Sequence, residues 1–177
     1  MRLTDYTDYT MRVLMYCAAH PDRLVTVNEL AQEHGISRHH LTKIVTDLGR
    51  QGLLQTVRGR GGGMRLSVDP ARIRVADVVR TTETDFRLVE CFDARSNRCP
   101  LTPTCRLKGL LESAMDAYFE VLEGRTLADL VAPDAAKRGA ARAPDAAAPI
   151  PVRSARTTRP TPLRPRARRS QAERADA

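Results

Sequence analysis

The sequence predicts a mainly α-helical fold with a small β wing: a winged helix-turn-helix domain, a long dimerisation helix and a disordered C-terminal tail. Three observations predict this architecture. Two capped helical segments flank a glycine turn between Thr26 and Gln51, and two strand-like segments flank a glycine-rich loop at 58–63. Apolar residues then recur at helical spacing from Leu107 to Leu122.

The first predicted helix covers residues 10–19. Its apolar residues at positions 11, 14, 15 and 18 have the spacing of a helix with one buried side. Pro21 lacks a backbone N–H and disfavours helical geometry in the residue before it, so we expect the helix to end there. Cys17 lies among these apolar residues and is interpreted as a small buried hydrophobe.

Capping residues mark the next two helices. Thr26 can cap a short helix, with Glu29 at the capping-box position and Gly35 as its end. Ser37 then caps a third helix over residues 38–51. The apolar residues on one side of this third helix are Leu41, Ile44, Val45 and Leu48. Two helices joined by a tight glycine turn predict a helix-turn-helix motif.

The wing follows this motif. Residues 53–57 and 64–68 are predicted as short strands, because the glycines at 58–63 permit positive φ angles and close backbone approach. A further helix is predicted over residues 75–82. The long helix at 107–122 is amphipathic, and its acidic residues face outward: Glu112, Asp116, Glu120 and Glu123.

The net charge of +8 is unevenly distributed. Residues 134–177 hold eleven Lys/Arg and four Asp/Glu, whereas the first 133 residues hold eighteen basic and seventeen acidic side chains. Within that nearly neutral body, residues 38–65 contain six basic side chains and one acidic side chain. Such a local basic face is typical of a surface that docks a polyanion, although a solvated face or a protein contact gives the same charge.

Double-stranded DNA is the polyanion that this pattern favours. In a winged helix-turn-helix the second helix of the motif enters the major groove with its N-terminal residues first. Side chains there can contact base edges or phosphates, and arginines at the wing tip can enter a minor groove. The candidate DNA-binding residues are Ser37, Arg38, His39, His40, Thr42, Lys43, Arg58 and Arg60.

Three of the four cysteines lie close together, at Cys91, Cys99 and Cys105, in a stretch interrupted by Pro100 and Pro103. Their spacing does not match the Cys-x2-Cys pairs of zinc ribbons. Three thiolates in a loop suit an iron–sulfur cluster, and a [4Fe–4S] cube would then need a weaker fourth ligand on one iron. A zinc site or a thiol redox switch is the alternative.

Four segments are therefore expected. Residues 1–83 form the winged helix-turn-helix DNA-binding domain, and residues 84–106 form the cysteine-containing, cluster-binding loop. Residues 107–132 hold the dimerisation helix and its end. Residues 133–177 are rich in Ala, Arg and Pro and lack an apolar period, so they are predicted to be disordered.

Four stretches carry a resemblance to a known family. They are "MRLTDYTDYTMRVLMY" at the start, "VNELAQEHGISRHHLTKIVTDLGRQGLL" across the helix-turn-helix, "GRGGGMRL" at the wing, and the ECF…CP…CRLKG segment. Together they resemble the NsrR family, nitric-oxide-sensing transcriptional repressors in a larger group of winged-helix regulators that includes IscR. The resemblance covers residues 1–133.

This resemblance implies a cluster site. By analogy with the family, the three cysteines would hold a [4Fe–4S] cluster, and Asp8 from the partner subunit would be the fourth ligand. Arg12, one helical turn beyond Asp8, would support that carboxylate. IscR-like members carry a histidine ligand to a [2Fe–2S] cluster at the position of Lys108, which favours the [4Fe–4S] reading over the [2Fe–2S] alternative. The gap between Cys91 and Cys99 is longer than the family pattern.

The resemblance also implies partners. It predicts a homodimer that binds a palindromic DNA operator, represses nitrosative-stress genes, and responds to nitric oxide through nitrosylation of the cluster. No nucleophile–base pair or phosphate-binding loop is found, so an enzyme is not expected. No apolar run is long enough to span a bilayer and residues 1–12 lack a secretory pattern, so we expect a cytoplasmic protein without a membrane partner.

Overall fold

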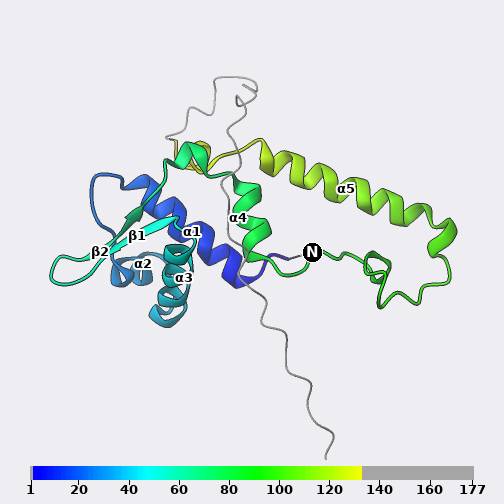
Figure 1. Ribbon diagram of the computed structural model, residues 1–177, viewed down its shortest axis with the longest axis horizontal. Helices are drawn as coiled ribbons and strands as arrows, with labels where there is room; N and C mark the ends of the chain where they lie inside the picture. Colours follow the sequence, from blue (N-terminus) through cyan, green and yellow to red (C-terminus); the bar gives the residue numbers. More distant parts are fainter. Residues whose placement is uncertain (1, 133–177) are drawn as a thin grey trace, which may run out of the picture.

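The computed structural model describes residues 2–132, and Figure 1 shows a helical body built around α1, with the wing at one end and α5 extending from the other. The predicted winged helix-turn-helix is confirmed. The predicted disorder of residues 133–177 lies outside the described residues. The α-helices and strands are α1 Asp5–Ala19, α2 Val27–His34, α3 Arg38–Arg50, β1 Leu54–Val57, β2 Gly63–Leu66, α4 Val75–Thr82, α5 Arg106–Glu123 and α6 Leu127–Val131, and three short 3-10 turns are η1 Pro70–Arg72, η2 Glu90–Phe92 and η3 Thr102–Thr104.

Helix α1 begins at Asp5, well before the predicted start at residue 10. Thr4 caps it, because the Thr4 hydroxyl accepts a hydrogen bond from the Thr7 N–H. Thr7 and Thr10 are completely buried, so the first turns of α1 face inward with threonines. The predicted start was wrong because a search for apolar spacing does not recognise buried threonines.

The helix-turn-helix forms as its capping residues predict. Thr26 accepts from the Glu29 N–H while the Glu29 carboxylate accepts from the Thr26 N–H, which is the predicted capping box. Gly35 ends α2 at φ 65°, a left-handed conformation that favours glycine. Ser37 caps α3 by accepting from the His40 N–H, and α3 ends at Arg50, one residue before the predicted end.

The wing is an antiparallel pair of short strands, with Val57 opposite Gly63. It is tied to the segment before α2, because Val25 N–H donates to the Met64 carbonyl (2.8 Å) and Met64 N–H donates to the Val25 carbonyl (2.7 Å). A Cβ at Gly63 would lie 2.6 Å from the Val25 carbonyl oxygen. Glycine is therefore required there by the close approach of two backbones.

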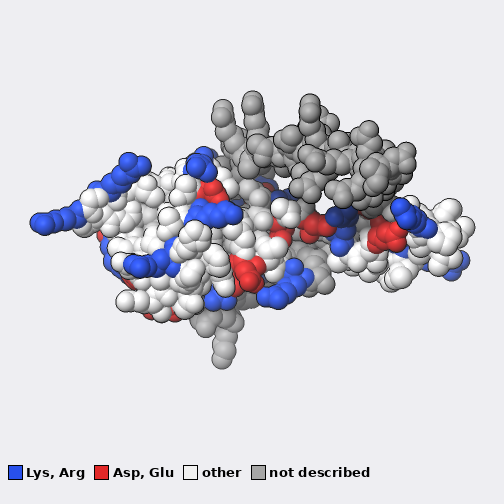
Figure 2. Space-filling view, turned by 90° about the horizontal axis from the view of Figure 1, so that it is seen from below, with Lys and Arg blue, Asp and Glu red and all other residues white. Residues whose placement is uncertain are grey.

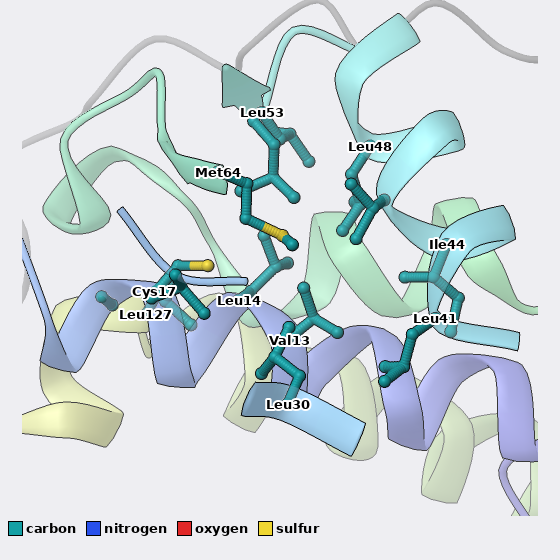
Figure 3. Packing of buried hydrophobic residues seen from close by; sticks show 14 of the residues in the cluster. Val13, Leu14, Cys17, Leu30, Leu41, Ile44, Leu48, Leu53, Met64 and Leu127 are labelled. Atoms are coloured by element: carbon teal, nitrogen blue, oxygen red, sulfur yellow. The ribbon is translucent and has the colours of Figure 1, made fainter. Parts of the chain in front are cut away.

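The core lies between α1 and α3, and Figure 3 shows the side chains that fill it. Leu14 of α1 and Leu41 and Leu48 of α3 are almost completely buried, which confirms the predicted apolar side of α3. Met64 enters this core from the wing. The core therefore fixes the orientation of α3 and of the wing together.

Helix α6 closes the core from the C-terminal side and was not predicted. A Thr126–Asp129 capping box starts it, and the side chain of Leu127 is buried near Cys17 of α1. The Leu127 N–H donates to the Ile73 carbonyl (2.8 Å). The chain thus leaves the body through the cysteine loop and α5 and then returns to it.

Helix α5 spans the predicted long helix, and its acidic residues are exposed as predicted. It is attached to the body near its C-terminal end, where Arg80 of α4 pairs with Glu123 (2.5 Å) and lies over the Phe119 ring (4.4 Å). Most of its apolar side is not covered within the described chain, since Leu110 is 66 % exposed and Met115 is the one residue of α5 that is buried.

Candidate nucleic-acid interface and cysteine loop

Helix α3 presents its N-terminal residues to solvent and its opposite side to the core. All six candidate residues at its start are exposed: Ser37, Arg38, His39, His40, Thr42 and Lys43. Because the buried leucines fix the rotation of the helix, these side chains share the outer face that a duplex would meet. The arrangement is that of a recognition helix.

Hydrogen bonds inside the motif already use part of this surface. The Thr42 hydroxyl donates to the Arg38 carbonyl (2.7 Å), and the Arg38 guanidinium donates to the Asn28 side chain of α2 (3.2 Å). Ser37 is the cap of α3. These contacts hold the helix start in place, and the exposed side chains of His39 and His40 are well placed for base or phosphate contacts.

Arg58 and Arg60 lie in the exposed loop between β1 and β2. Gly59 and Gly61 in the same loop have φ angles of 100° and 72°, which lets the chain reverse tightly between the two arginines and the second strand. Figure 2 shows Lys and Arg side chains projecting from the end of the molecule where Figure 1 places this loop. A basic tip that reaches beyond the body suits a minor-groove contact.

The cysteine loop, defined here as residues 84–105, contains no buried residue. Polar contacts hold it: Asp93 accepts from the Arg87 guanidinium (2.7 Å) and from the Ser96 hydroxyl (2.9 Å). Hydrogen bonds from backbone and side-chain donors lower the pKa of Asp93, and hydrogen bonds from Arg87 lower the pKa of Asp85 to about 2. The loop is therefore shaped by charges at its surface and lacks an apolar core.

Cys91, Cys99 and Cys105 are free, half-buried thiols in this loop. Among the described residues, no three His, Cys, Asp or Glu side chains are placed to hold a metal ion. Cys105 is the N-cap residue of α5, where its side chain makes no capping hydrogen bond, and the first turn of α5 has no acidic residue. Helix N–H groups together with Arg106 and Lys108 make this end of the loop favourable for negative charge.

Asp8 lies on the exposed part of α1 and pairs with Arg12, with 2.7 Å between the carboxylate and the guanidinium. Both side chains are nearly half exposed, so a second subunit can reach them. The i,i+4 pair that the sequence predicts is therefore present, and within residues 2–132 Asp8 is not grouped with the cysteines around a metal position.

Cys17 is separate from the other three cysteines. It is 2 % exposed in the core of α1, and burial raises the pKa of its thiol to about 12. A thiol so protonated and so enclosed is a packing residue, as predicted.

Two tyrosines of α1 contact the recognition helix and were not among the sequence candidates. The Tyr6 hydroxyl donates to the Asp47 carboxylate (3.0 Å), and the Tyr9 ring stacks with His40 at a centroid distance of 6.2 Å. Burial and the Asp47 hydrogen bond raise the pKa of Tyr6 to about 12, so this hydroxyl remains a donor. Their three-residue spacing, which places both rings on one side of a helix, was the signal available in the sequence.

The exposed basic helix and the basic wing define a winged-helix, DNA-binding regulator. The chain belongs to the Rrf2 family, whose model is described as an iron-dependent transcriptional regulator and matches residues 3–133. It is 49 % identical over 132 residues to the HTH-type transcriptional regulator NsrR of Bacillus subtilis, covering 74 % of this chain and 90 % of that one.

Solved structures share this fold. A transcriptional regulator from Listeria innocua matches with a TM-score of 0.61 and 25 % identity, covering 80 % of this chain and 95 % of that one. IscR of T. potens matches with a TM-score of 0.60 and 24 % identity, covering 80 % and 94 %, and at that identity the likeness shows the fold alone.

The family fixes the general function. The chain is a DNA-binding transcriptional regulator, and the prediction that it is not an enzyme is confirmed. In residues 2–132 no helix combines the length and the apolar character that crossing a membrane requires.

Proposed function

We propose that the chain is a homodimeric repressor that senses nitric oxide through a [4Fe–4S] cluster and controls nitrosative-stress genes. Cys91, Cys99 and Cys105 would hold the cluster, with Asp8 of the partner subunit as the fourth ligand. The observation that carries the proposal is the set of three half-buried free thiols in one loop of a chain that is 49 % identical to an NsrR regulator.

The donor set fits such a cluster chemically. Soft iron prefers thiolates, and three thiols on four irons leave one position for a weaker oxygen ligand such as a carboxylate. Lys108 stands where IscR-like relatives carry a histidine, so a histidine ligand from that position is absent. When bound, the cluster would supply an iron accessible to nitric oxide at the position without a thiolate.

The residues around the thiols suit a bound anionic group. The start of α5 offers N–H groups without a side-chain cap, next to Arg106 and to Lys108, which pairs with Glu112 (3.4 Å), and the loop has no buried residue. The thiols are not assembled in the chain alone. Cluster binding would therefore have to bring the three thiols of the cysteine loop together. The loop is held by polar surface contacts, and rearranging these costs less free energy than rearranging an apolar core.

The dimer is supported by α5. Its exposed apolar residues Leu107, Leu110 and Val121 would be buried by a second α5, and a twofold pair of recognition helices would match a palindrome. In the partner subunit, the half-exposed carboxylate of Asp8 would keep its pairing with Arg12, which would orient it toward the neighbouring loop. Loss of the cluster would then change the separation of the two recognition helices.

The energy required for this control is modest. A 100-fold loss of operator affinity corresponds to about 2.7 kcal/mol, which is within the range of allosteric couplings.

A second candidate is a regulator without this cluster, in which the cysteines bind zinc, act as a thiol switch, or hold a [2Fe–2S] cluster. Within this alternative, the thiol switch is favoured by the three half-buried free thiols, which in the described residues are not assembled around a metal position. It predicts that oxidants or iron status, and not nitric oxide, control DNA binding.

One experiment separates the two. The full chain is purified without oxygen, its iron, sulfide and zinc are measured, and its visible absorbance is followed during addition of nitric oxide. The proposal predicts about four irons and four sulfides per chain, loss of the absorbance band with nitric oxide, and simultaneous release of operator DNA. A colourless protein that contains zinc contradicts it. In a control, the Cys91→Ser, Cys99→Ser, Cys105→Ser variant should contain no iron.

A further inference from the structure

The residue from which the cysteine loop departs also holds the start of α1. Glu83 follows the last residue of α4, and its Oε1 atom accepts hydrogen bonds from the Thr4 N–H (2.6 Å) and the Thr4 hydroxyl (3.1 Å). Thr4 is in turn the N-cap of α1. A displacement of Glu83 by the loop would therefore act directly on the first turn of α1.

A buried pair of threonines strengthens this junction. The Thr7 hydroxyl donates to the Thr82 hydroxyl (2.9 Å), which donates to the Val78 carbonyl (2.8 Å). Thr7 and Thr82 are both buried, so leaving these groups unpaired would be costly. Buried hydrogen bonds therefore join the end of α4 to the start of α1.

The other side of the same two turns of α1 touches the recognition helix. Tyr6 donates to Asp47, and the Lys43 ammonium lies 5.8 Å from the centre of the Tyr6 ring. Tyr9 stacks with His40, and Arg12, the partner of Asp8, lies 5.9 Å from the centre of the Tyr9 ring. Lys43 and His40 are candidate DNA contacts, so α1 fixes the side chains that would meet the duplex.

We infer that Glu83 and Tyr6 are positioning residues that pass the state of the cysteine loop to the recognition helix. Glu83 connects the loop to α1, and Tyr6 connects α1 to α3. The inference rests on the proposed function, because it states how a change at the cysteines reaches the DNA surface. Helix α1 is packed in the core, so a displacement of its first turn can be passed along the helix to the turn that contacts α3.

The test is a double-mutant cycle on the full chain. Glu83→Ala, Tyr6→Phe and the double variant are prepared with and without iron. Their affinities are measured by fluorescence anisotropy with a labelled duplex that the iron-loaded wild type selects from a random library. The quantity compared is the ratio of the dissociation constants of the iron-free and iron-loaded forms, which reports coupling and not stability.

We expect a wild-type ratio of about 5 to 150, lowered at least about threefold by either single variant. The ratio of the double variant should be no lower than that of the single variant with the larger effect, because Glu83 and Tyr6 lie on one connection. Glu83→Gln should retain most of the ratio, because its amide oxygen can still accept from the Thr4 N–H. Tyr16→Phe removes from the same helix a hydroxyl that donates to Glu29 (2.8 Å) and is not part of this connection, so it is the matched control and should leave the ratio unchanged.

The outcomes are distinct. A wild-type ratio near one overturns the proposed function, and the inference with it. A normal wild-type ratio that Tyr6→Phe leaves unchanged overturns the inference alone, and so does one that Glu83→Ala leaves unchanged. Tyr6→Phe removes one hydroxyl from a half-buried ring and should leave the fold intact. The affinity ratio of this variant therefore tests the inference even if Glu83→Ala does not fold.

Discussion

The body formed by α1–α4, the wing and α6 differs from the region formed by the cysteine loop and α5 in what holds it together. The body has a continuous apolar core from Val13 to Leu127. The cysteine loop has no buried residue, and α5 leaves most of its apolar side exposed in the described chain. The candidate DNA-binding surface is thus built on a continuous core, whereas under the proposed function a cofactor and a partner subunit would complete the cysteine loop and α5.

Truncating a leucine in the core of the body should cause the largest loss of unfolding free energy. Leu48→Ala removes a nearly fully buried side chain between α3 and α1 and should cost about 2–5 kcal/mol of unfolding free energy. Leu101→Ala, in the cysteine loop and 64 % exposed, should change the unfolding free energy by less than about 0.5 kcal/mol. Urea denaturation followed by circular dichroism measures both, and equal losses would remove the distinction between the regions.

Replacing one glycine in each region by alanine should give the next largest change in stability. Gly63→Ala places a Cβ 2.6 Å from the Val25 carbonyl and should destabilise the wing and body by about 1–3 kcal/mol. Gly109→Ala has no atom within 4 Å of the new Cβ and should stabilise α5 by about 0.5–1 kcal/mol. Opposite shifts in melting temperature are expected, and a stabilised Gly63→Ala variant would contradict the close approach.

Lowering the pH should affect the stability of the body through Glu29 and not through the cysteine loop. The Arg23 and Tyr16 hydrogen bonds lower the pKa of Glu29 from 4.5 to about 2, so its contribution is present above pH 4.5 and is lost as pH falls toward 2. Glu29→Gln should therefore lower the melting temperature near neutral pH, with a difference that shrinks in acid. Asp85→Asn changes an equally acidic carboxyl of the cysteine loop and should leave the melting of the body unaltered.

The smallest effect is expected at the thiols. Replacing Cys91, Cys99 and Cys105 by serine should change the unfolding free energy of the iron-free chain by less than about 0.5 kcal/mol, because none of them is part of the core. Cys17→Ser is the matched comparison, and it should cost more because it buries a hydroxyl among apolar side chains. Calorimetry of both iron-free variants measures the two losses, and a larger loss in the triple variant would contradict the expectation.

The difference between the regions also explains what the sequence could predict. The helix-turn-helix depends on local signals, namely the Thr26–Glu29 capping box, Gly35 and Ser37, and these were predicted correctly. The start of α1 depends on a distant partner, since Thr7 is buried against Thr82. Helix α6 carries a local signal, the Thr126–Asp129 capping box, but its short apolar segment is placed by the burial of Leu127 against the core. Apolar spacing alone cannot detect such tertiary burial.

The residues of the candidate site likewise differ in whether the sequence could predict them. The exposed residues of α3 and the wing could be placed from the fold class, because the motif dictates which helix faces DNA. The contacts of Tyr6 with Asp47 and of Glu83 with Thr4 join residues far apart in the chain, and no local pattern indicates them. The ligand role of the three cysteines and Asp8 stays a prediction.

Amide hydrogen exchange on the full chain, with and without iron under anoxic conditions, tests most directly whether iron completes the sensing region of a scaffold that is already stable. Iron should slow exchange in residues 84–110 by at least about tenfold, which corresponds to about 1.4 kcal/mol, while amides near Leu41 and Leu48 in α3 stay as protected as in the iron-free chain. Exchange in residues 84–110 that is indifferent to iron, or an α3 core that becomes protected only when iron is bound, would contradict this division of the molecule.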